Sequence, residues 1–106
     1  MSTPEPEAAP EVPEPQLEAY AILTAMGPTY FWYQWQTLRE VSAELGLTGM
    51  DADAATRSMV EGALATLLDA GLTPAATMDL IPVKPLAEME RTVIEAYRTA
   101  LPALHA

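Results

Sequence analysis

The spacing of apolar residues along the chain predicts helices. Between residues 51 and 71 apolar side chains recur at intervals of three and four, which places them on one face of a helix. A second stripe of this kind runs from about Pro85 to Leu101, through Leu86, Met89, Val93, Tyr97 and Leu101. No segment alternates apolar and polar residues with the period of two that marks a half-buried strand. The pattern therefore predicts an all-α fold.

Glycine and proline divide the first half of this pattern. A first helix is expected from about Pro15 to Met26 and a second from Pro28 to Leu45. Gly27-Pro28 separates them, because glycine relaxes the turn and proline suits the first position of a helix, where its missing N–H leaves no bond unmade. Gly46 follows the second helix in the pattern of a C-terminal glycine cap.

The second half of the chain carries similar signals. A third helix is expected to begin near Asp51 or Asp53, whose carboxylates can cap free amides, and to end at Gly71. Thr73-Pro74 predicts the start of a short fourth helix that reaches about Leu80. The two prolines of the segment 81–85 then predict a loop before the last helix. The expected architecture is thus a bundle of about five helices.

Residues 1–16 differ in composition from the rest of the chain. They hold five prolines and four glutamates, with no basic and no aromatic residue. Proline removes backbone donors and like charges extend a chain, so this segment is predicted to be a disordered acidic tail or linker. Residues 17–106 are predicted to form one helical domain, which at this length gains stability from oligomerisation.

Charge and cysteine content limit the partners. The formal net charge is −10, from 15 acidic and 5 basic residues, so phosphate backbones and anionic lipid surfaces repel the chain. We therefore predict no nucleic-acid partner and no membrane partner. The chain has no cysteine, which excludes disulfides and thiolate metal sites and fits a reducing compartment. Because the N-terminus also lacks the features of a signal peptide, a cytoplasmic location is expected.

Few residues are suited to catalysis. The single histidine, His105, lies next to the C-terminus, where a frayed and solvated position is expected. With no cysteine and no other histidine, no nucleophile–base pair and no zinc site can be proposed. The five glycines are dispersed and form no phosphate-binding loop. We predict no catalytic, cofactor-binding or metal-binding residue in this chain.

The most unusual feature is a cluster of aromatic residues in the second helix. Five aromatics occupy six positions between Tyr30 and Trp35. At about 100° per residue they surround almost the whole helix, more than one small domain can bury. Part of the cluster should therefore face a second chain, a missing domain or a ligand. The alternative is an ordinary core with some half-exposed aromatics. Aromatics are enriched at the centres of interfaces, so we favour an interface. The predicted interface residues are Tyr30, Phe31, Trp32, Trp35, Leu38, Gly62 and Ala63.

The order of these motifs resembles the C-terminal domain of the pyrroline-5-carboxylate reductase family. The stretch Thr24–Tyr30 is similar to the family's S-G-S-G-P-A-Y helix entry, and Gly62-Ala63 with Leu67-Leu68 is similar to its G-A-x-x-L-L helix. The resemblance covers roughly residues 20–101. It implies a helical domain like the C-terminal domain of 6-phosphogluconate dehydrogenase, interlocked with a second copy as a homodimer. It also marks Thr24, Gly27, Pro28 and Lys84 as residues that could face a substrate.

The chain departs from that family in two ways. The family's N-terminal dinucleotide-binding domain has no counterpart here, and no G-x-G-x-x-G turn is present, so NAD(P)H is expected only by way of a separate domain. The family's substrate loop, S-P-G-G-T-T, aligns with residues 82–87, where its hydroxyls and paired glycines are missing. Enzyme activity is therefore not expected of this chain alone.

Three functions remain open at the level of sequence. The first is a non-catalytic helical dimerisation domain. The second is a fragment or subunit of an NAD(P)H-dependent imine or pyrroline-5-carboxylate reductase of proline biosynthesis, completed by a dinucleotide-binding domain. The third is a helical adaptor that binds another protein.

Overall fold

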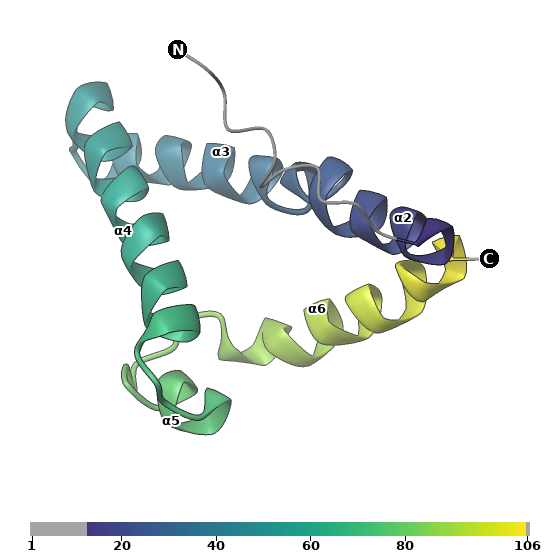
Figure 1. Cartoon of the computed structure of the whole chain (residues 1–106). Coiled ribbons are helices and arrows are strands. Elements are labelled where there is room, and N and C mark those ends of the chain that lie inside the picture. Colours follow the sequence, from purple (N-terminus) through teal and green to yellow (C-terminus); the bar gives the residue numbers. More distant parts are fainter. Residues whose placement is uncertain (1–12, 106) are drawn as a thin grey trace, which may run out of the picture.

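The computed structural model describes residues 13–105, and within that range the secondary structure is entirely helical. The predicted all-α class is confirmed. The first part of this range forms α2 (Glu14–Tyr20), a π-helical turn η1 (Ala21–Ala25) and α3 (Pro28–Glu44). These three run end to end as one rod in Figure 1. The predicted tail at residues 1–16 lies mostly outside the described residues, and its last three residues belong to α2.

The π-helical turn lies where the sequence predicts an interruption. Pro28 has no N–H to donate to the preceding turn, so the backbone widens there and the Met26 N–H bonds to the carbonyl of Ala21 at 3.1 Å. Gly27 is buried at this point, and a Cβ there would overlap the carbonyl oxygen of Leu23. Glycine is therefore required by the close approach of the backbone.

A tight turn connects the rod to α4 (Gly49–Asp69). Gly46 has φ +99° and Gly71 has φ +77°, so both predicted helix-ending glycines adopt the left-handed conformation of such caps. The predicted start of α4 at an aspartate is wrong. The N-cap is Thr48, whose hydroxyl accepts the Asp51 N–H at 3.1 Å.

The remaining elements are α5 (Pro74–Met78), α6 (Ala87–Ala100) and a 3₁₀ turn η2 (Pro102–Leu104). Thr73 caps α5 as predicted, because its hydroxyl accepts the Ala76 N–H at 3.1 Å. Both α5 and α6 are slightly shorter than the sequence suggests, and η2 was not expected. None of the described helices is long and apolar enough to cross a membrane.

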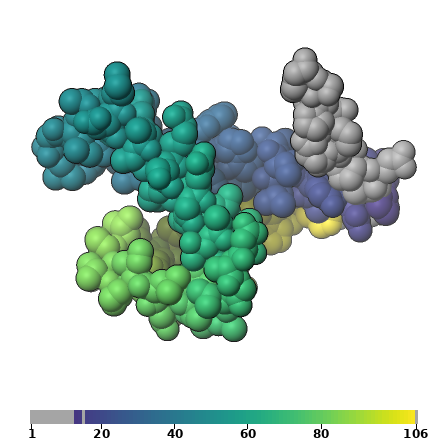
Figure 2. All heavy atoms as spheres, turned by 60° about the vertical axis from the view of Figure 1, so that its left-hand side comes forward, coloured from purple at the N-terminus to yellow at the C-terminus, as the bar shows by residue number. Residues whose placement is uncertain are grey.

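The helices are arranged as an open triangle. In Figure 1 the rod forms one side, α4 the second and α6 the third, so that the two ends of the described chain meet at one corner. Figure 2 shows the same arrangement as separate lobes, with α4 and α5 extending away from the rod. The sides touch near the corners, which leaves most of each helix without a neighbour from the same chain.

This arrangement buries almost nothing. Among the described residues only Gly27 and Ala52 are buried, the latter with 3% of its surface exposed. Large apolar side chains that a folded domain would cover lie in the open on every side of the triangle, with Leu64 at 54% and Leu86 at 73% exposure. The predicted stripes therefore exist as helix faces, but within one chain they do not meet to form a core.

Candidate assembly surface

The aromatic cluster of α3 divides into two parts. Tyr30 is half-buried, its hydroxyl donates to the carbonyl of Ile22, and its ring meets that of Tyr97 edge-on with centroids 5.6 Å apart. Phe31 stacks on Trp35 at 5.4 Å and 14° between planes. Tyr30 thus ties the rod to α6, whereas the Phe31–Trp35 pair has no described ring from another helix against it.

The other predicted interface residues are open. Trp32 has 62% of its surface exposed, and Leu38 has 41%. On α4, Gly62 and Ala63 are exposed, and a Cβ at Gly62 would meet no atom within 4 Å. In one chain these residues leave an aromatic surface on α3 and a smooth surface on α4 uncovered. We call the exposed faces of α3, α4 and α6 together the assembly surface.

Tyr97 stands at the junction of α3 and α6, among three tyrosines. Burial raises the pKa of the Tyr97 hydroxyl, and the neighbouring Tyr33 and Tyr30 raise it further, because negative charge on any of these phenolates would oppose its ionisation. The group is therefore held in its neutral form.

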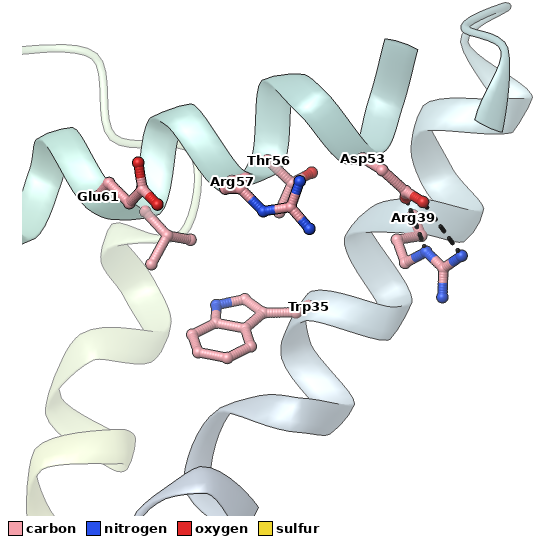
Figure 3. Close-up of a pocket in the computed structure, with 7 residues that line it drawn as sticks. Trp35, Arg39, Asp53, Thr56, Arg57 and Glu61 are labelled. Carbon is pink, nitrogen blue, oxygen red and sulfur yellow. Dashed lines mark hydrogen bonds and ion pairs between the residues drawn. The ribbon is translucent and has the colours of Figure 1, made fainter. Parts of the chain in front are cut away.

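A cleft of about 500 Å³ opens between α3 and α4, and Figure 3 shows its lining. Trp35 projects from α3 toward the middle of the triangle, and Arg57 reaches in from α4 above it. At one end of the cleft the Arg39 Nε lies 3.0 Å from Asp53 Oδ1, and its Nη1 donates to the Gln36 side chain at 3.1 Å. The lining is completed by Thr56, Val60 and Glu61.

The residues predicted to face a substrate do not come together within one chain. Thr24, Gly27 and Pro28 lie at the π-helical turn, where the Thr24 hydroxyl donates to the carbonyl of Tyr20 at 2.8 Å. Lys84 lies before the start of α6, and its Nζ donates to the carbonyl of Ile81 at 2.9 Å. α6 contacts the rod near the C-terminal end of α6, whereas Lys84 precedes its first turn. Most of the length of α6, about 20 Å, therefore separates Lys84 from the residues at the π-helical turn.

Two side chains have roles that the sequence did not predict. His105, expected to be frayed and solvated, lies with its Nδ1 2.7 Å from Glu18 Oε1 and so joins the end of the chain to α2. Asp53, expected as a cap, instead pairs with Arg39. No local pattern could have found either pair, because the partners are brought together only by the relative placement of distant helices. No group of acidic residues and histidine in residues 13–105 could hold a metal ion.

Comparisons with protein-family models, with curated proteins and with solved structures gave no match to this chain. The resemblance to the pyrroline-5-carboxylate reductase family therefore stays a prediction from the motifs.

Proposed function

We propose that the chain is a non-catalytic helical dimerisation domain, in which two copies cover each other's assembly surface. The observation that carries this proposal is the near absence of buried side chains among residues 13–105 of the single chain. Folding requires apolar burial to offset the conformational entropy of ordering the chain, and an open triangle of helices supplies too little of it.

Surface area supports the same conclusion. The chain exposes 8907 Å², whereas a compact monomer of 11.4 kDa exposes roughly 5,800 Å². Residues 1–12 and 106 lie outside the described range, so the area of a fully extended chain can be subtracted for them. The remaining residues still expose roughly 1,700 Å² more than a compact domain of their mass. A standard interface buries about 800 Å² per partner, so an excess of this size suits an obligate interface.

The chemistry of the exposed faces favours a protein partner over a small ligand. The exposed residues of α3 include Phe31, Trp32 and Tyr33, and aromatic residues are enriched at the buried centres of interfaces. The likeness to the C-terminal domain of pyrroline-5-carboxylate reductases suggests the same arrangement, with a bundle like that of 6-phosphogluconate dehydrogenase formed from both copies. A second copy is the simplest partner, because it brings an equal area of matching surface.

Sedimentation equilibrium of the full chain tests this proposal. We expect a dimer through the micromolar range, and a melting temperature that rises with protein concentration, because association and folding are then one equilibrium. A folded monomer at high micromolar concentration, with a melting temperature independent of concentration, would refute it.

A further inference from the structure

One carboxylate lies within the apolar stripe of α6. At about 100° per residue, Glu90 falls on the same helix face as Leu86, Val93 and Tyr97, at separations of four, three and seven residues. Glu88, by contrast, falls on the opposite, polar face. No basic residue of the described chain lies within ion-pairing distance of Glu90. Whatever covers this stripe must therefore meet a carboxylate as well as apolar side chains.

One basic residue is suited to pair with Glu90. Arg39 is already paired with Asp53, and Lys84 bonds within its own loop. Arg91 and Arg98 lie on α6 itself, where they line a hollow together with Glu90 but beyond ion-pairing distance of it. That leaves Arg57 among the five basic residues of the chain, and no carboxylate of residues 13–105 lies within ion-pairing distance of it.

The surroundings of Arg57 match those of Glu90. Arg57 stands in the cleft between α3 and α4 above the half-buried Trp35 (Figure 3), and the half-buried Val60 lines the same cleft. The first turns of α6 present the reverse arrangement. There a carboxylate stands beside apolar side chains that are uncovered, with Met89 52% exposed and Val93 43%. The cleft also holds Arg39, Asp53 and Glu61, so its charges balance, and its match to this part of α6 lies in the apolar side chains of both and in the opposite charges of Arg57 and Glu90.

The chain's own α6 does not fill its own cleft. The residues that line the cleft come from α3 and α4 alone, and α6 is held at its other end by the contact of Tyr97 with Tyr30. We propose that the first turns of α6 from a second copy dock in the α3–α4 cleft, with Met89 on Trp35 and Val60 and the Glu90 carboxylate paired with Arg57. This inference rests on the proposed homodimer. Two-fold symmetry would form the contact once in each direction, which gives two equivalent contacts per dimer.

Chemical crosslinking tests the contact directly, because the chain has no native cysteine. Full-length Val60→Cys and Met89→Cys chains are unfolded together, refolded as a mixture and treated with a short bismaleimide. We expect a crosslinked species that contains one chain of each kind. Each variant alone should give little crosslinked product, and so should the control mixture of Val60→Cys with Arg98→Cys, which places the thiol on the polar face of α6. Equal crosslinking of the Met89→Cys and Arg98→Cys mixtures would overturn the inference.

Charge reversal provides an independent test by sedimentation equilibrium. Arg57→Glu should weaken dimerisation at least tenfold, since it places two carboxylates together, and the double variant Arg57→Glu/Glu90→Arg should recover most of that loss. The matched control Arg98→Glu, on α6 beyond its first turns, should dimerise like the wild type. A wild-type dimer that Arg57→Glu leaves unweakened would overturn the placement of α6 but not the proposed function, whereas a wild-type monomer would overturn both.

Discussion

Replacing Trp32 with alanine distinguishes an assembled chain from an isolated one. Trp32 leaves 62% of its surface exposed in the single chain. For a side chain that can bury up to about 250 Å², this is roughly 150 Å² still open to water. Covering that area in a dimer is worth about 4 kcal/mol at 25 cal/mol per Å². We therefore expect Trp32→Ala to make the free energy of dimerisation less favourable by about 4 kcal/mol for each Trp32 side chain that the partner covers.

The measurement combines sedimentation equilibrium with fluorescence. Trp32→Ala should be monomeric or unfolded at micromolar concentrations where the wild type is dimeric, whereas Gln16→Ala, an exposed change on α2 outside the assembly surface, should match the wild type. In the variant Trp35→Phe, Trp32 is the only indole, and its emission should shift to shorter wavelength as concentration rises. The reasoning fails if Trp32→Ala dimerises as tightly as the wild type and the indole emission stays that of a water-exposed side chain.

Four other predictions concern single features. Gly27→Ala should lower the free energy of unfolding by about 1–3 kcal/mol in urea, because its Cβ overlaps the Leu23 carbonyl; unchanged stability would contradict that close approach. Thr48→Ala should cost about 1 kcal/mol through the lost cap, and Thr48→Ser should retain most of it; equal losses in both would argue against the cap. The raised pKa of Tyr97 stabilises the fold at pH values below the ordinary tyrosine pKa, and this contribution is lost as pH rises through the raised value. Tyr97→Phe should therefore reduce the alkaline loss of stability, and an identical pH profile would count against this assignment. NADH and NADPH should give no saturable change in nicotinamide fluorescence, and micromolar binding would contradict a non-catalytic chain.

Local signals predicted most of the helix boundaries. Gly46 and Gly71 end helices because their positive φ angles suit glycine, and Thr73-Pro74 opens α5 because a hydroxyl cap and a proline both favour a first turn. The start of α4 was misplaced, since Thr48 competes with the nearby aspartates for the same role and threonine is also a good cap. Helix caps and glycine turns can be predicted from the sequence because they depend on interactions among a few neighbouring residues.

The contacts between helices were not predictable in the same way. The Arg39–Asp53 pair depends on the angle at which α3 and α4 cross, and the His105–Glu18 pair on the closing of the triangle. The cleft that contains Trp35 exists only because these helices diverge beyond their contact. Periodicity indicated an apolar face on α4 and on α6, but it did not indicate which helix faces meet.

The near absence of buried side chains in the described part of the chain has a genetic consequence. If two copies supply each other's core, the sequence of one chain is part of the folding information of the other. A variant subunit made alongside the wild type would enter mixed pairs and impair normal chains as well as its own. Unpaired subunits, with their apolar faces open, would be the preferred substrates of cellular proteases, so the amount of functional protein would fall more steeply than gene dosage.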